Sequence, residues 1–195
     1  MVRRSIIVTG TPCVGKTSVA RLLASKLDAL YVNLTELALR EELVLGKDEE
    51  RDSAIVDEHL MRSRIREIFE GCGKKDVIFD GHYAVNVVPE DLRPHVFVLR
   101  RHPVELQEFM RRRGFSERKI RENLASEILD VCLCDALEVF GEDQVCELDV
   151  SSKSTEEIAC VILDVLSGSE KCCIGIVDWL GKLESEDLLD EFLKF

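Results

Sequence analysis

The stretch from Gly10 to Thr17 reads GTPCVGKT and fits the pattern G-x-x-x-x-G-K-[ST] at every fixed position. It follows an apolar, β-branched run at residues 5–9, which predicts a short buried strand. After it, Val19, Leu22 and Leu23 recur at helical spacing. A strand, a glycine loop and a helix in this order direct backbone N–H groups and the positive end of the helix toward an anion. The stretch therefore predicts a phosphate-binding loop.

Side chains of this loop have separate expected roles. Lys16 supplies a mobile positive charge for the β- and γ-phosphates, and the Thr17 hydroxyl is a ligand for Mg²⁺. Cys13 lies at a helix N-terminus in an anion-attracting loop, which favours the thiolate. We therefore expect Cys13 to react with alkylating agents faster than core thiols. The nucleotide phosphates are expected to contact Gly10, Cys13, Val14, Gly15, Lys16, Thr17 and Ser18.

The composition is that of an enzyme-sized globular domain. The chain has 195 residues, of which 46% are hydrophobic and 33% charged. No apolar run approaches the length that spans a bilayer, and the apolar residues after the N-terminal arginines are too few for a signal peptide, so we expect a cytoplasmic protein without membrane contact. The net charge of −12 disfavours binding to bare nucleic acid. It would suit a basic protein partner, but the charge alone favours the simpler explanation of solubility.

Eight cysteines are present, but none forms a C-x-x-C pair or a zinc-finger spacing. Reduced, mostly buried thiols of a cytoplasmic protein are the simplest interpretation. A disulfide stays open as an alternative for a hyperthermophilic source.

Beyond the loop, strand-like and helical segments alternate, which predicts a doubly wound α/β fold with a parallel sheet covered by helices on both faces. Strands are expected near residues 31–33, 77–79, 96–99 and 145–150, and a polar turn at 46–52. Helices are expected at 34–45, 54–69, 104–113, 116–140 and 155–166.

The segment VIFDGH, residues 77–82, carries the second chemical signal. Asp80 ends a buried strand, as the acidic partner of a phosphate loop does when it reaches Mg²⁺. His82 follows two residues later and has a near-neutral reference pKa, which suits orienting water or a substrate. A histidine that bonds only to backbone at a strand end is an equal alternative.

The third signal is RRRGFSERK, residues 111–119. Fixed guanidinium groups at a helix end beside a glycine are suited to neutralising a transferring phosphoryl group. A solvated basic helix face is the alternative, and it is disfavoured by the phosphate loop upstream.

Taken together, these motifs resemble the adenylate kinase isoenzyme six family, whose members are similar to nucleoside monophosphate kinases and, in eukaryotes, double as ATPases in small-subunit ribosome maturation. The resemblance covers residues 5–166, and the D-x-H of Asp80 and His82 is its sharpest element. Ordinary adenylate kinases carry an arginine in a DG-x-x-R segment there, which this chain lacks. The string GIVDW, residues 175–179, is similar to a C-terminal extension of archaeal members.

The resemblance implies a five-stranded P-loop fold with a short lid at about 111–120, monophosphate-binding helices at about 34–71, a kinase domain over 1–167 and a helical extension over 168–195. It implies MgATP and AMP as substrates, and a basic small-subunit ribosomal protein as partner. Carried over by position, the implied catalytic residues are Lys16, Asp80, His82 and Arg113; the metal ligands are Thr17 and Asp80; the further ATP contacts are Arg112 and Lys153; and the AMP contacts are Asn33, Thr35, Arg40 and Asp57.

The chain departs from the family pattern at three positions. Cys13 replaces a usual glycine, Leu39 stands where eukaryotic members have an arginine, and Phe109 replaces a second lid arginine. Because of the second departure, Arg40 is the arginine expected to bind the monophosphate. The third leaves Arg111 or Arg112 as substitutes in the lid.

The expected reaction is transfer of the γ-phosphoryl group of ATP to AMP with accompanying ATP hydrolysis. A nucleotide-driven switch in ribosome assembly is the alternative, and a kinase for a non-nucleotide metabolite is a third reading. The apolar positions of residues 174–193 recur at near-helical spacing. We expect this tail to pack on the parent domain, with a docking helix for a partner as the alternative.

Overall fold

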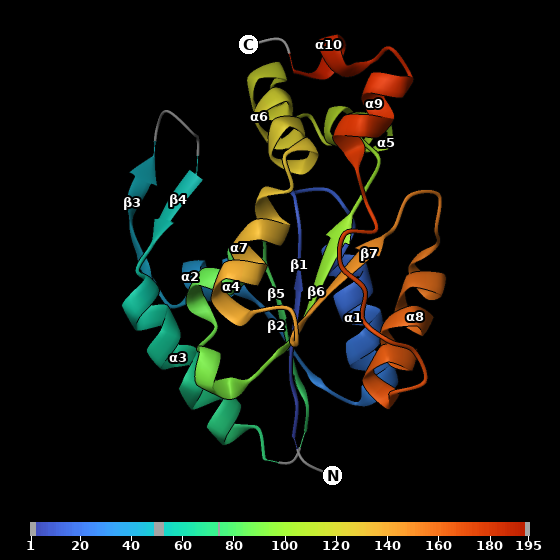
Figure 1. Cartoon of the computed structure of the whole chain (residues 1–195). Helices are drawn as coiled ribbons and strands as arrows, with labels where there is room; N and C mark the ends of the chain where they lie inside the picture. Colours follow the sequence, from blue (N-terminus) through green and yellow to red (C-terminus); the bar gives the residue numbers. More distant parts are fainter. Residues whose placement is uncertain (1–2, 49–52, 74, 194–195) are drawn as a thin grey trace.

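The segment before the glycine loop is the central strand of the sheet. In a computed structural model that describes residues 3–48, 53–73 and 75–193, strand β1 (Ser5–Thr9) is buried along its whole length. It lies between β5 (Val77–Asp80) and β6 (His95–Arg100), and all strands of this sheet run parallel in the order β2-β5-β1-β6-β7 (Figure 1). The outer strands are β2 (Leu30–Asn33) and β7 (Val145–Asp149). The five-stranded parallel sheet expected from the sequence is confirmed.

Helices cover both faces of this sheet (Figure 1). Because side chains alternate along a strand, Ile6 and Val8 pack into one core and Ile7 packs into the other. The first core contains α1 (Lys16–Leu27), α5 (Pro103–Arg112), α6 (Glu117–Ile128) and α8 (Thr155–Ser167). The second contains α2 (Leu34–Arg40), α3 (Glu58–Gly71), α4 (Ala84–Val87) and α7 (Val131–Phe140), and a 3₁₀ turn spans Glu90–Leu92.

Residues 34–56 differ from the expected pattern. The expected helix over 34–45 ends at Arg40, because Glu42 adopts a left-handed conformation with φ of 54°. An antiparallel hairpin follows, formed by β3 (Val44–Asp48) and β4 (Ser53–Val56), and α3 starts four residues later than expected (Figure 1). Apolar residues such as Leu45 and Ile55 fit either structure locally, and pairing across the hairpin decides between them. The expected polar turn at 46–52 thus overlaps β3, and residues 49–52 lie outside the described part of the chain.

A break divides the single helix expected over 116–140. Asp130 is left-handed, with φ of 58°, and separates α6 from α7. The buried Arg100 guanidinium donates to the Glu127 carbonyl at 2.7 Å and pairs with the Asp130 carboxylate. Arg100 thereby holds groups from both sides of the junction, a tertiary contact that helical periodicity cannot reveal.

The C-terminal tail packs against the first core. It contains α9 (Trp179–Ser185) and α10 (Leu189–Phe192), and it buries Trp179, Leu183 and Phe192 beside α5 and α6 (Figure 1). This confirms packing on the parent domain, whereas the division of the chain at residue 168 stays a prediction.

All eight cysteines have free thiols. Three of those thiols are half-buried and four are exposed, so only Cys146 matches the expectation of burial. Over the described ranges, no helix has both the length and the apolar character needed to cross a membrane.

Candidate active site

The glycine loop makes one wall of a pocket at the carboxyl end of the sheet. Gly10 is required there, because its φ is 130° and a Cβ atom would lie 2.3 Å from the Leu99 carbonyl oxygen. Gly15, with φ of 112°, precedes the first turn of α1. The pocket has a volume of about 190 Å³ and is lined by Pro12, Cys13, Gly15, Lys16, Thr17, Ser18, His82, Arg113 and Phe115. A helix N-terminus, an ammonium and a guanidinium converge on this space, which suits phosphate groups.

Lys16 bends back onto its own loop. Its ammonium donates to the carbonyl oxygens of Gly10 at 2.8 Å and Thr11 at 2.9 Å. Burial lowers the pKa of Lys16, and the nearby Asp80 carboxylate opposes that shift. Val14 is fully buried behind the loop, whereas the side chain of Ser18 is exposed.

Asp80 is buried at the end of β5 and accepts three hydrogen bonds on one carboxylate oxygen. The donors are the Thr17 hydroxyl at 2.8 Å, the Tyr31 hydroxyl at 2.8 Å and the Asn33 amide at 3.2 Å. The register between β2 and β5 places Asn33 opposite Asp80 and Tyr31 two residues earlier on the same side. Asn33 is expected at the monophosphate; in this structure its side-chain amide contacts Asp80, and its assignment to the monophosphate stays a prediction. Tyr31 was not anticipated, although its period-two spacing from Asn33 was available as a signal.

Thr17 and Asp80 offer hard oxygen donors side by side, which is the ligand chemistry that Mg²⁺ prefers. The described residues contain no group of three or more His, Cys, Asp or Glu side chains that would hold a metal alone. This donor set fits a magnesium ion that takes its remaining ligands from phosphates and water.

His82 lies at the junction of two cavities. It lines the phosphate pocket and also a larger neighbouring cavity. Desolvation by burial lowers the pKa of His82 below its usual 6.5, and the nearby positive charges of Lys16 and Lys119 lower it further. The imidazole is therefore neutral at pH 7 and carries a lone pair that can accept a proton.

Cys13 corrects an expectation. Its pKa is raised, because desolvation outweighs the lowering effects of Arg113 and Lys16, so the thiol form predominates. The sequence pattern indicated the helix N-terminus but not the degree of enclosure. Cys13 also has φ of 72°, in the region that favours the glycine usual at this position of the family.

We predict that Cys13 is alkylated more slowly than the exposed thiols of Cys134 and Cys160, and that MgATP slows it further. Pulse labelling with iodoacetamide, read site by site by mass spectrometry, measures both effects. The exposed cysteines serve as internal controls, because they lie outside the pocket. Equal labelling of Cys13 with and without MgATP would place this side chain away from the phosphates.

The lid contributes one arginine to the pocket. Arg113, at the end of α5, lines the pocket beside Cys13. Arg112 instead forms an exposed ion pair with Glu108 at 2.9 Å, and Arg111 lies near Glu117 at 3.7 Å. Arg112 is therefore not among the residues that line the phosphate pocket, and its expected contact with ATP stays a prediction.

Three expected monophosphate contacts lie apart from the pocket. Arg40 is exposed and pairs with Glu41 at 3.2 Å. Asp57 caps α3 by accepting from the Leu60 amide at 3.0 Å, and the exposed Thr35 lies near Tyr83 in the first turn of α2. Lys153 follows β7 and donates to the Asp149 carbonyl oxygen at 2.5 Å. These four assignments stay predictions.

A larger cavity adjoins the phosphate pocket at His82. Its volume is about 830 Å³, within the range of small-molecule sites. It lies between β4, α4, α6 and α7, and it is lined by Thr11, Pro12, Ala54, His82, Tyr83, Asn86, Phe115, Lys119, Glu122, Asn123, Ser126, Val131, Cys132 and Asp135. The two cavities share Pro12, His82 and Phe115, so a molecule in one lies next to a molecule in the other.

A buried charge network braces the glycine loop from behind. Glu127 accepts from Thr11 in the loop at 2.5 Å, from Arg100 at 2.9 Å and from Trp179 of the tail at 3.0 Å. Arg100 also bonds to Glu147 at 2.8 Å, and Arg101 donates to the Val14 carbonyl oxygen at 3.2 Å. This network was not predicted from the sequence. The local signal for it was the presence of two adjacent arginines, Arg100 and Arg101, at the end of the apolar run VFVLRR.

Comparison with known proteins agrees with this geometry. A family model described as "AAA domain" matches residues 6–130. A protein of Pyrococcus furiosus named "Putative adenylate kinase" is 41% identical over 174 residues, covering 89% of this chain and 90% of that protein. A protein of the same name from Thermococcus kodakarensis is 36% identical, and the alignment covers 97% of this chain and 97% of that protein. Another from Methanocaldococcus jannaschii is 34% identical, covering 91% of this chain and 93% of that protein.

Solved structures share the fold at low sequence identity. A shikimate kinase from Acinetobacter baumannii aligns with a TM-score of 0.57 at 19% identity, covering 87% of this chain and 96% of that one. A thymidylate kinase from Candida albicans aligns with a TM-score of 0.54 at 13% identity, covering 86% and 92%. The fold is thus that of P-loop kinases, and by sequence the chain belongs to the family of archaeal proteins named "Putative adenylate kinase".

Proposed function

We propose that this protein is an adenylate kinase that transfers the γ-phosphoryl group of MgATP to AMP, with ATP hydrolysis as an accompanying activity. The observation that carries the proposal is the meeting of two cavities at His82. One is lined by the glycine loop, Lys16 and Arg113, and the other is large enough for a nucleoside. The names of the archaeal relatives support the same substrates.

In this proposal, catalysis rests on positioning and charge. The loop amides and Lys16 bind the β- and γ-phosphates, which compete with the loop carbonyls for the Lys16 ammonium. Arg113 neutralises charge on the transferring group from the lid side. Thr17 and Asp80 would hold Mg²⁺, which neutralises phosphate charge when bound. Closure of the lid over both cavities excludes competing water.

The neutral His82 accounts for the accompanying hydrolysis. Its lowered pKa leaves it unprotonated at pH 7, so it can accept a hydrogen bond from a water molecule that has entered in place of AMP and orient that water. Transfer to AMP needs this role less, because the AMP phosphate already has an ionised oxygen as the nucleophile.

We predict that Asp80→Asn impairs both activities and raises the Mg²⁺ concentration needed for half-maximal rate, because both reactions require the metal. His82→Gly is expected to lower ATP hydrolysis on the order of 10²-fold, the lower end of general-base contributions, and AMP phosphorylation much less. Coupled assays of ADP formation with AMP, and of phosphate release without it, measure the two rates.

His95→Gln is the matched control for His82. His95 begins β6 at the opposite end of the sheet from the glycine loop, so its replacement should leave both rates unchanged. Equal loss of both activities in His82→Gly would contradict a role in orienting water and would indicate phosphate binding or a structural role.

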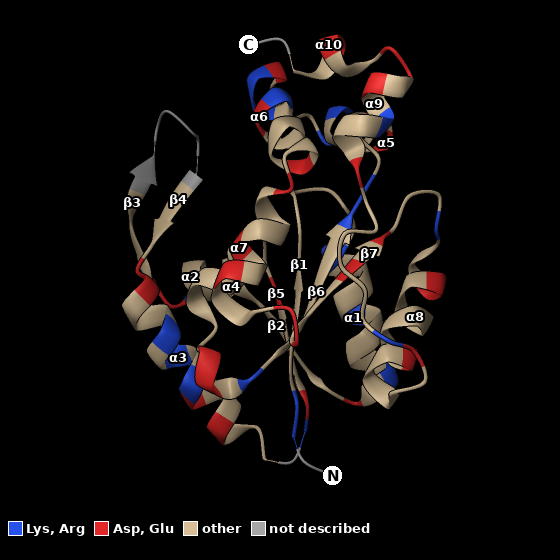
Figure 2. Cartoon of the chain, viewed as in Figure 1, with Lys and Arg blue, Asp and Glu red and all other residues tan. Residues whose placement is uncertain are grey.

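The ribosome-assembly alternative has weaker support. The tail, its candidate docking helix, buries Trp179, Leu183 and Phe192 against the protein itself. Acidic side chains are spread over several helices in Figure 2 rather than gathered on one element. Hydrolysis that rises when basic small-subunit ribosomal proteins are added, without AMP-dependent ADP formation, would favour this switch over the kinase. A screen of phosphoryl acceptors tests the third reading, a metabolite kinase.

A further inference from the structure

The two cavities differ in the charge of their walls. Among the described residues, the lining of the phosphate pocket has two cations, Lys16 and Arg113, and no acidic side chain. The described lining of the larger cavity contains the cation Lys119 together with Glu122, Asp135 and several neutral polar side chains. Anionic groups are therefore favoured at the His82 end, and an uncharged, hydrogen-bonding group is favoured between α4, α6 and α7.

Two residues that line the larger cavity have a buried side-chain polar atom without a hydrogen-bond partner among the described residues: Asn123, through its amide nitrogen, and Tyr83, through its hydroxyl. Asn123 on α6 is only 8% exposed and lines the cavity, and its side-chain nitrogen Nδ2 has no hydrogen-bond partner among the described residues. A buried amide donor without a partner is destabilising by about 1–3 kcal/mol, so its presence calls for an explanation. A ligand atom that accepts its hydrogen bond explains it.

We propose that Asn123 recognises the adenine base of the acceptor nucleotide, an inference that rests on the proposed kinase function. An asparagine amide presents a donor beside an acceptor, which matches a ring nitrogen and the 6-amino group of adenine. Hypoxanthine and guanine carry an oxygen in place of that amine, so the amide oxygen would face another acceptor. The apolar walls formed by Pro12, Phe115 and Val131 suit the faces of a planar ring.

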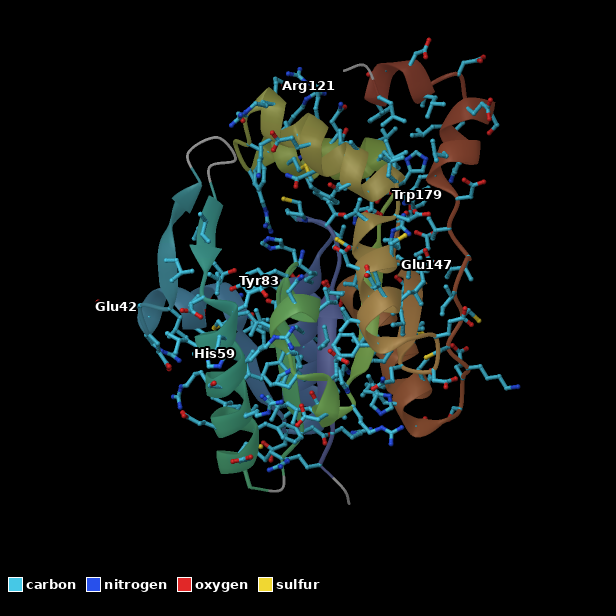
Figure 3. The ribbon with its side chains drawn as sticks, turned by 60° about the vertical axis from the view of Figure 1, so that its left-hand side comes forward. Glu42, His59, Tyr83, Arg121, Glu147 and Trp179 are labelled. Carbon is cyan, nitrogen blue, oxygen red and sulfur yellow. The ribbon has the colours of Figure 1, made fainter. Side chains whose placement is uncertain are left out.

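Figure 3 shows the placement of the elements that would enclose the base. Tyr83 lies beside the base of the hairpin β3–β4, whereas Arg121 lies on α6 at the outer edge of the molecule. In this proposal Asn123 is a specificity-determining residue, and the phosphate end of AMP would lie at His82 and Arg113, which line the phosphate pocket.

Calorimetric titration of the full-length protein, with Mg²⁺ and the ATP analogue AMPPNP saturating the donor site, tests this role. Wild type is expected to bind AMP about 5- to 150-fold more tightly than IMP or GMP, the discrimination of one bidentate amide–base pair. Asn123→Ala should weaken AMP binding by a similar factor and remove the preference over IMP. Asn123→Asp keeps the size and removes the donor, so it should weaken AMP binding as well.

Arg121→Ala is the matched control, because Arg121 is exposed on the same helix and outside the cavity lining. It should leave the affinity for AMP unchanged, and all three variants should bind AMPPNP as wild type does. Equal affinity of wild type for AMP and IMP would overturn the inference, even if the Asn123 variants fail to fold. So would AMP binding within twofold of wild type in both Asn123 variants. Failure of wild type to bind any monophosphate would instead overturn the proposed kinase function.

Discussion

Lys16→Ala is expected to lower kcat for phosphoryl transfer by about 10²–10³-fold, equivalent to roughly 2.7–4 kcal/mol of lost transition-state stabilisation. Among the described residues, Lys16 is the one lysine that lines the phosphate pocket, and it lies in the loop that would enclose the β- and γ-phosphates. Charge on those oxygens grows during transfer, so the loss should appear in kcat more than in the KM for AMP. Steady-state kinetics with ATP and AMP varied separately measure both parameters.

We expect Lys16→Ala to lose turnover without a matching loss of thermal stability. Burial lowers the pKa of Lys16, so the folded state holds that proton less tightly than the unfolded chain does. Removing the charge therefore does not remove a stabilising ionisation, and a near-normal melting temperature is expected. Lys26→Ala, at the exposed end of the same helix, is the control and should change neither quantity. Turnover of Lys16→Ala within threefold of wild type would contradict the assignment.

Truncation after Ser169 is expected to remove most of the folding free energy of the protein. The deleted segment buries Trp179, Leu183 and Phe192, each worth roughly 1.5–3 kcal/mol, or roughly 5–9 kcal/mol together. A domain of ordinary stability has only about 5–15 kcal/mol in total. The deletion also removes the hydrogen bond that the Trp179 indole donates to Glu127. Glu127 in turn accepts a hydrogen bond from Thr11 of the glycine loop. Thermal unfolding monitored by circular dichroism should show a large fall in Tm or no cooperative transition.

Two point variants separate packing from the hydrogen bond. Trp179→Phe keeps an aromatic ring but removes the donor to Glu127, and a loss of about 1–3 kcal/mol is expected. Leu180→Ser alters a neighbour that is 39% exposed and should change stability by less than about 0.5 kcal/mol. A truncated protein that keeps the Tm and turnover of wild type would show that the tail is dispensable to this fold.

The sequence by itself determined the elements that local patterns encode. The run at residues 5–9 is short, apolar and followed by the glycine loop, so the central strand and the start of α1 were predictable from periodicity and from Gly10 and Gly15. Asp80 was found in the same way, because an acidic residue that ends a buried strand at this distance from the loop reaches the same edge of the sheet. These features depend on neighbours in sequence, and therefore they can be read without a structure.

Only the tertiary structure decided what depends on residues distant in sequence. Thr11 and Glu127 bond across 116 positions, and Trp179 joins them from the tail, so no local pattern signals that contact. The hairpin of residues 44–56 needs pairing between two strands, and the division of α6 from α7 needs the guanidinium of Arg100. The pKa of Cys13 followed its burial rather than its place at a helix N-terminus, because desolvation is set by everything that surrounds the thiol. Propensity and motif describe the backbone locally, whereas burial and charge pairing arise only when distant segments meet.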